Sequence, residues 1–174
     1  ISHALTLRDR LYDAPYYRLV HAEADGLPGV VIDRFGDTAV IQPNAAWAEV
    51  HIEALTAAPI AVTGVRNILK NGTGRSRSLE GLADETIMLC GSIDAPVEVP
   101  MNGAVYMADL IGGQKTGIFF DQRPNHAFAA RLASGARVLD MFSHVGGFSL
   151  AALAAGADSA LAVDGSAPAR ATPS

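Results

Sequence analysis

The chain has 174 residues, of which 49% are hydrophobic and 18% charged, with a net charge of −5. This composition excludes an intrinsically disordered chain and predicts a sizeable core. No apolar stretch approaches the roughly 20 residues of a membrane span, and the first residues lack a secretory signal pattern. The single cysteine, Cys90, excludes an internal disulfide and a cysteine-based zinc site. We expect a cytoplasmic protein.

The first hundred or so residues alternate short strand patterns with turn residues. The predicted elements are a helix at 6–12, strands at 17–22, 30–34 and 38–42, an amphipathic helix at 45–57, and strands at 60–65 and 86–89. The apolar side of the second helix would carry Trp47, Val50, Ile52 and Leu55. Asn102-Gly103 lies between two further strand patterns and is a strong hairpin signal. Residues 15–110 are therefore predicted to form an α+β unit rich in antiparallel strands, preceded by a helical linker at 1–14.

Four basic residues lie within twelve positions that contain no acid. They are Arg66, Lys70, Arg75 and Arg77. The asparagines and glycines between them predict an exposed loop. A solvated basic surface is one interpretation of this segment, and a loop that contacts RNA phosphates is the other.

The pattern changes after Gly112 to helix, strand, helix, strand with short connections. The predicted elements are helices at 122–133 and 148–155 and buried strands at 137–141 and 160–163. This order is typical of a parallel α/β sheet. We place a domain boundary near 108–117 and assign residues 111–174 to the second domain. The expected fold class is α/β and α+β, a small antiparallel-rich α+β domain followed by the start of a Rossmann-like domain.

The stretch from Val138 to Phe148 joins an apolar strand to a helix through a turn with two adjacent glycines. Glycines allow the backbone to approach a ligand closely, and the amides at the start of the helix favour an anion. The strand ends in Asp140, and the next strand ends at Asp164, where a carboxylate can accept hydrogen bonds from ribose hydroxyls. This pattern predicts a nucleoside-containing, cationic cofactor. An ordinary strand–helix turn with glycines for packing is the alternative.

A second glycine-rich stretch occupies residues 112–117 and is followed by Asp121-Gln122-Arg123. It matches neither the Walker A loop nor the dinucleotide pattern G-x-G-x-x-G, which disfavours a nicotinamide-dependent enzyme. Its Gln, Lys and Thr predict a loop that presents polar side chains to a ligand. The alternative is an inter-domain linker whose Asp121 caps the next helix.

These segments resemble the class I S-adenosylmethionine-dependent methyltransferases of ribosomal RNA. The matching stretches are GGQKTGIFFDQR (112–123), VLDMFSHVGGFSLAALAAGA (138–157) and AVDGSAPA (162–169). The resemblance is greatest to the family that methylates carbon 5 of a cytosine in large-subunit rRNA. YYRLVHAEADGLPGVVIDRFGD (16–37) is similar to the central domain of that family, which follows an RNA-binding PUA domain.

The resemblance implies S-adenosyl-L-methionine as cofactor, large-subunit rRNA as partner and no membrane partner. It implies that the Asp140–Gly147 turn holds the methionine and ribose parts and that Asp164 binds the ribose hydroxyls. Arg123 would contact the cofactor carboxylate or brace Asp121. The implied cofactor-binding residues are Asp140, Phe142, Ser143, His144, Gly146, Gly147, Asp164, Gln114, Lys115, Thr116 and Arg123.

The chain departs from the family at the catalytic step. Carbon-5 methylation needs a thiolate nucleophile, and Cys90 lies in an apolar run before the cofactor motifs, so we interpret it as a core cysteine. We expect a truncated chain whose catalytic residues lie beyond residue 174. Its exposed sheet edge would favour self-association or a homodimer.

Two other functions stay open from the sequence. Methylation of guanine within the same fold needs no cysteine, and a non-catalytic RNA-binding module would use the α+β unit with the Arg66–Arg77 segment. His21, His51 and His126 lack the spacing of metal ligands, so surface or core roles are expected and no metal is predicted.

Overall fold

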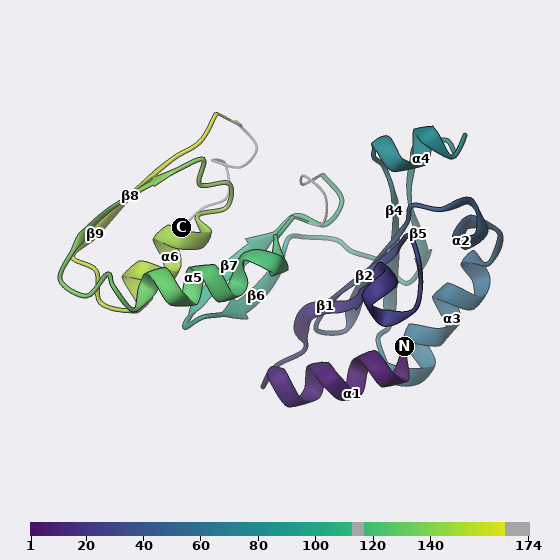
Figure 1. Cartoon of the computed structure of the whole chain (residues 1–174), viewed down its shortest axis with the longest axis horizontal. Helices are drawn as coiled ribbons and strands as arrows, with labels where there is room; N and C mark the ends of the chain where they lie inside the picture. The colour runs from purple at the N-terminus through teal and green to yellow at the C-terminus, as the bar shows by residue number, and fades with distance from the viewer. Residues whose placement is uncertain (113–116, 166–174) are drawn as a thin grey trace. The chain divides into compact units, whose positions relative to one another are not determined.

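The computed structural model describes residues 1–112 and 117–165. The predictions for Gln114, Lys115 and Thr116 lie outside the described residues. The chain divides into two compact units, residues 1–95 and 96–174, which Figure 1 colours from purple to teal and from teal to yellow. No helix of the described residues is long and apolar enough to cross a membrane.

Unit 1 is built on a five-stranded sheet in the order β1-β2-β3-β4-β5. Its elements are α1 (Ser2–Leu11), β1 (Tyr16–His21), the 3₁₀ turn η1 (Ala22–Asp25), β2 (Val30–Phe35), β3 (Thr38–Pro43), α2 (Ala46–Val50), α3 (Ile52–Thr63), β4 (Asn67–Gly72), α4 (Arg75–Leu79) and β5 (Glu85–Cys90). Neighbouring strands are antiparallel except β3 and β4, which run parallel because α2 and α3 connect them across the sheet.

The core of unit 1 lies between the sheet and its helices. Strand residues Leu19, Val20, Ile32 and Ile41 are fully buried, and Ala48 and Leu55 pack against the same cluster from α2 and α3. Cys90 is partly buried against this cluster, which agrees with its interpretation as a core residue.

Two predictions for unit 1 are wrong. Residues 60–63 end helix α3 and do not begin a strand, because α3 continues through Pro59 for four more residues. The expected helix at 45–57 is divided at His51 into α2 and α3, and Val50, assigned to the apolar side, is 81% exposed. The buried position in α2 is Ala48.

Unit 2 begins with the antiparallel hairpin of β6 (Val97–Met101) and β7 (Ala104–Ala108), which confirms the Asn102-Gly103 signal. The remaining elements are η2 (Phe120–Gln122), α5 (Arg123–Ala130), β8 (Arg137–Met141), α6 (Gly147–Ala154) and β9 (Ser159–Val163). β8 and β9 pair in parallel through α6, as expected. The hairpin belongs to unit 2 because β7 packs against α6, so the division falls at 95/96 and not near 108–117.

The expectation that both parallel strands are buried is also wrong. Leu139 and Met141 in β8 are 61% and 52% exposed, and their register partners Leu161 and Val163 in β9 are 62% and 38% exposed. Paired residues lie on the same face of a sheet, so these four side chains form one open apolar face. Helix α6 packs against the two strands, but nothing among the described residues covers this face.

Candidate functional site

The turn between β8 and α6 has an unusual backbone. Phe142 and His144 have φ values of +61° and +51°, and Gly146, the residue before α6, has φ +78°. Only the glycine adopts this left-handed region without a steric penalty. Two strained non-glycine residues within three positions are typical of a ligand-binding turn, where the surrounding structure holds them.

Asp140 holds the start of α6. Its carboxylate is buried, and Oδ2 accepts hydrogen bonds from the backbone N–H of Ser149 at 3.0 Å and from its hydroxyl at 2.8 Å. These bonds satisfy an amide in the first turn of the helix, which has no partner within the helix itself. Asp140 therefore fixes the turn, a structural role that the sequence interpretation did not include.

Asp164 connects the end of β9 to the same turn. Its Oδ2 accepts a hydrogen bond from the backbone N–H of His144 at 2.8 Å, and the N–H of Ser143 donates to the carbonyl of Val163 at 3.2 Å. The carboxylate is partly exposed. The parallel pairing thus brings the two acids to the carboxyl end of the sheet, on either side of the turn.

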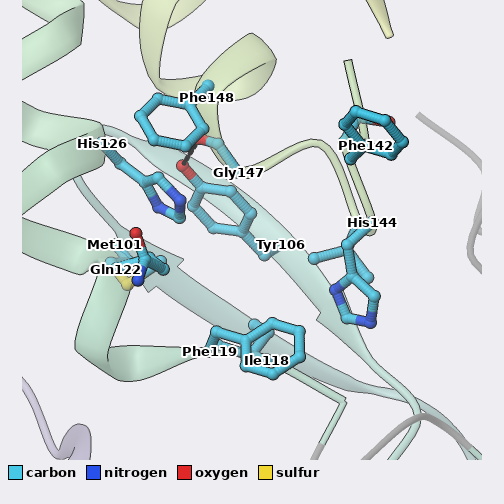
Figure 2. Close-up of a pocket in the computed structure, with 12 residues that line it drawn as sticks. Met101, Tyr106, Ile118, Phe119, Gln122, His126, Phe142, His144, Gly147 and Phe148 are labelled. Atoms are coloured by element: carbon cyan, nitrogen blue, oxygen red, sulfur yellow. Dashed lines mark hydrogen bonds between the residues drawn. The ribbon is translucent and has the colours of Figure 1, made fainter. Parts of the chain in front are cut away.

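A pocket of about 140 Å³ lies beside the turn (Figure 2). Ser143, His144 and Gly147 line it from the turn, and Phe119 and Gln122 line it from the segment before α5. Phe142 also lines the pocket, and this residue is 87% exposed. The pocket therefore joins two of the segments that carry the family resemblance.

Two further residues of the pocket were missed by the sequence interpretation. Tyr106 comes from β7, and its buried hydroxyl donates to the carbonyl of Gly147 at 3.2 Å; burial raises the pKa of this phenol to about 12. His126 comes from α5 and packs edge to face on the ring of Phe148. A buried, core-type histidine was one of the roles expected for His126, but its place in the pocket was not.

The two histidines of the pocket are held in their neutral forms. Burial lowers the pKa of His126 and of His144, and the carboxylates nearest to each offset this only in part. The ring of His144 also meets Phe119 edge to face, with centroids 4.9 Å apart. At neutral pH the pocket therefore carries no positive charge from these side chains.

Two of the four basic residues predicted to contact RNA are buried. The Lys70 ammonium forms ion pairs with Glu49 at 2.6 Å and Glu85 at 2.7 Å. The Arg77 side chain is only 2% exposed, pairs with Glu49 at 2.8 Å and donates to the backbone carbonyls of Pro43 and Ala83. The prediction of an exposed loop is wrong at these two positions, because acids distant in sequence take up both charges.

The other predicted site residues are not among those that line the pocket. Arg66 and Arg75 are exposed, and Arg66 forms a surface ion pair with Asp37. Arg123 begins α5, where its carbonyl accepts from the side chain of Asn102 at 3.0 Å, but it is not among the residues that line the pocket. Its contact with a cofactor stays a prediction.

Comparison with known sequences identifies a family. The model of the S-adenosylmethionine-dependent methyltransferases matches residues 16–171. The chain is 39% identical over 150 residues to ribosomal RNA large subunit methyltransferase I of Tolumonas auensis, covering 85% of this chain and 38% of the relative. It is 38% identical over 172 residues to the enzyme of the same name from Alteromonas mediterranea, covering 97% and 43%.

A solved structure supports the same relationship. A methyltransferase in complex with SAH superimposes with a TM-score of 0.80 at 26% identity, covering 98% of this chain and 43% of that one. The chain therefore spans about two fifths of the length of the proteins it matches. The matched part includes the whole of the turn and the pocket.

Proposed function

We propose, because the chain belongs to the S-adenosylmethionine-dependent methyltransferase family, that unit 2 binds S-adenosylmethionine beside the β8–α6 turn. The observation that carries the proposal is the link between Asp164 and the backbone of His144, which brings the end of β9 to the glycine turn. An acid at this position follows the second of two parallel strands, where open α/β sheets bind their ligands.

The described residues fit such a cofactor. Asp164 is partly exposed, and the pocket at the turn to which it bonds is mainly apolar, with the polar groups of Ser143 and His126 among its lining residues. Among the described residues that line the pocket there is no lysine or arginine, so none of them would repel a sulfonium cation. The carboxylates of Asp140 and Asp164, which bond to backbone amides of the turn and of the helix after it, favour a cation further.

The bound cofactor would supply an activated methyl group for transfer to a nucleophilic atom of the substrate. The chain's residues would hold and orient it: Asp164 would accept hydrogen bonds from the ribose, and the turn would surround the methionine part. Asp140 and Tyr106 keep the turn in place through their bonds to Ser149 and Gly147. A site held by buried hydrogen bonds needs little rearrangement on binding.

We propose large-subunit rRNA as the substrate, since the relatives are named as methyltransferases of that RNA. Carbon 5 of a cytosine is the proposed target, following the resemblance of the three motifs. That reaction requires a thiolate that adds to the base. The chain's one cysteine does not offer it, because Cys90 packs against the core of unit 1. Within the RNA-binding proposal, unit 1 would contribute Arg66 and Arg75, which are exposed.

Calorimetric titration of the chain with S-adenosylhomocysteine tests cofactor binding. We expect the wild type to bind and Asp164→Ala to have an affinity lower by about tenfold or more, because the substitution removes the carboxylate that would accept hydrogen bonds from the ribose hydroxyls. Glu53→Ala, an exposed acid of α3, is the matched control and should bind normally. A folded wild type that does not bind, or an Asp164→Ala variant that binds as well as the wild type, would contradict the proposal.

Methylation of guanine is the second candidate, because it needs no cysteine nucleophile. Incubation of rRNA and methyl-labelled cofactor with this chain and with a chain extended to the length of the relatives, followed by nucleoside analysis, separates the two. Label on guanine would favour the guanine reaction, whereas label on carbon 5 of cytosine would support the first proposal.

A further inference from the structure

The two glycines of the turn meet different requirements. Gly146 has φ +78°, which a side chain would strain, whereas the backbone of Gly147 lies outside the left-handed region. A Cβ at residue 147 would come within 2.3 Å of Cε1 and 2.5 Å of Nε2 of His126. Position 147 is therefore restricted to glycine by the imidazole of α5 and not by its own backbone.

His126 contacts two residues at the start of α6, Gly147 and Phe148. Its ring centroid lies 4.5 Å from that of Phe148, in an edge-to-face arrangement. Its side chain is 7% exposed, and Figure 2 shows it between α5, Tyr106 and Gly147. The imidazole thus supports the first turn of α6 from one side, while Tyr106 holds the carbonyl of Gly147.

The surroundings of the imidazole favour its neutral form. Nδ1 is buried without a hydrogen-bond partner among the described residues. Burial lowers the pKa of His126, and the charges that oppose this are Asp140 on β8 and Asp121 on η2. Asp140 already accepts two bonds from Ser149, and Asp121 is exposed. Protonation of the ring in this place would bury a positive charge without full compensation, which favours movement of the ring away from Gly147.

We propose that His126 is a positioning residue for the cofactor turn. Its neutral ring holds the Gly146-Gly147 turn in the conformation that binds S-adenosylmethionine, and the turn loosens when the ring is protonated or removed. This inference rests on the proposed function, because cofactor affinity is one of its readouts. The second glycine of the turn, Gly147, thus has a packing partner in His126, 21 positions away in the sequence.

A double-mutant cycle tests the packing without any ligand. Alanine normally stabilises a helix relative to glycine, so Gly147→Ala would raise the melting temperature if position 147 were open. We expect Gly147→Ala to melt below the wild type and the double variant His126→Ala/Gly147→Ala to melt above Gly147→Ala. A Gly147→Ala variant as stable as the wild type, or a double variant less stable than Gly147→Ala, would overturn the packing argument.

The pH dependence of binding tests the positioning role. Titrations with S-adenosylhomocysteine between pH 7.5 and 5.5 should show affinity falling towards acid pH, by up to about tenfold per pH unit when one proton is linked. His126→Gln, which cannot gain a charge, should flatten this profile. His3→Gln, an exposed histidine of α1, is the matched control and should keep the wild-type slope.

His144 also titrates within the pocket, so its contribution has to be separated. His144→Gln should retain the part of the slope that belongs to His126. A flat wild-type profile, or a slope that His144→Gln removes and His126→Gln leaves unchanged, would overturn the positioning role alone. If the folded wild type does not bind at any pH, the proposed function is overturned instead. The melting temperatures of the double-mutant cycle would still test whether His126 packs against residue 147.

Discussion

The five-stranded sheet of unit 1 and the two-stranded sheet of unit 2 use the same kinds of apolar residue with different results. Val20, Ile32 and Ile41 of unit 1 are fully buried, whereas Leu139 and Leu161 of unit 2 are more than half exposed. In unit 1, strands and helices from the whole unit close over one core. The comparison teaches that hydrophobicity predicts a strand, but the burial of that strand depends on what packs against it.

The two units also differ in how they use buried charge. Unit 1 places Lys70 and Arg77 inside the protein and pairs both with Glu49. Unit 2 buries Asp140 against the start of a helix and His126 in its neutral form. Buried charge in unit 1 therefore connects distant parts of the fold, whereas in unit 2 the buried polar groups shape the turn.

The largest expected effect comes from removing the shared acid of unit 1. Glu49→Ala leaves Arg77 buried without its carboxylate, so we expect unfolding to be easier by about 3–5 kcal/mol. Urea unfolding followed by the fluorescence of Trp47, the single tryptophan, measures this. Glu53→Ala, an exposed acid on α3, should change stability by less than about 0.5 kcal/mol. Equal effects of the two substitutions would contradict the role of the buried network.

The second prediction compares one leucine from each sheet. Leu19→Ala opens a cavity in the core of unit 1 and should cost about 2–5 kcal/mol. Leu139→Ala removes an exposed side chain from unit 2 and should cost less than about 0.5 kcal/mol. Thermal unfolding of both variants measures these losses of stability. A large loss of stability in Leu139→Ala would mean that the face carrying Leu139 is covered in the folded chain.

The two units should lose stability in different ranges of pH. Burial would raise the pKa of Asp25 and Glu49, but hydrogen bonds from Arg8, Lys70 and Arg77 outweigh it, so both pKa values are lowered. These two carboxylates contribute fully to the stability of unit 1 above their ordinary pKa values of 3.8 and 4.5. This stability is lost as the pH falls through the lowered pKa values of the folded chain. The pKa of His126 is lowered from 6.5, so its contribution to unit 2 is complete above that pH and declines below it.

Hydrogen exchange at a series of pH values distinguishes these two ranges. Amides of α6 should begin to lose protection as the pH falls below 6.5, and amides of β1–β3 only at more acid pH. Asp25→Asn and Glu49→Gln should weaken the acid dependence of unit 1 and leave that of α6 unchanged. Simultaneous loss of protection in both units would contradict this separation.

The smallest expected effect on stability concerns the open face of β8 and β9. Leu139→Lys and Leu161→Lys replace exposed apolar side chains, so unfolding should change by less than about 0.5 kcal/mol. If this face promotes self-association, both variants should sediment as smaller species than the wild type at equal concentration. If both variants sediment like the wild type, the open face of β8 and β9 is not a contact between copies of the chain.

Local signals in the sequence predicted most elements of both units. Asn102-Gly103 fixed the hairpin because few other dipeptides adopt its turn, and alternating apolar residues located β1, β2 and β3. The run at 60–65 was misread because its β-branched residues favour strands, while the helix continues through Pro59. The end of a helix that contains proline depends on packing that a local pattern does not show.

The candidate site was predictable only where its residues are adjacent in the chain. The glycine turn and the acids at the strand ends are contiguous motifs, and the structure places them together. Tyr106 and His126 reach the same turn from elements 41 and 21 positions away, and no spacing rule reveals them. Lys70 and Arg77 were misassigned for the same reason, since Glu49 lies 21 and 28 positions from them.

The single parallel pair of unit 1 has a consequence for the order in which the unit folds. β1, β2 and β3 follow one another through short turns, so their contacts can form with little loss of chain entropy. β3 and β4 can pair only after α2 and α3 have closed a loop of 23 residues between them, from Asn44 to Arg66. Pairings of larger sequence separation slow folding. We expect the hairpins of β1–β3 to form first and the docking of β4, with Lys70 carried on it, to limit the rate.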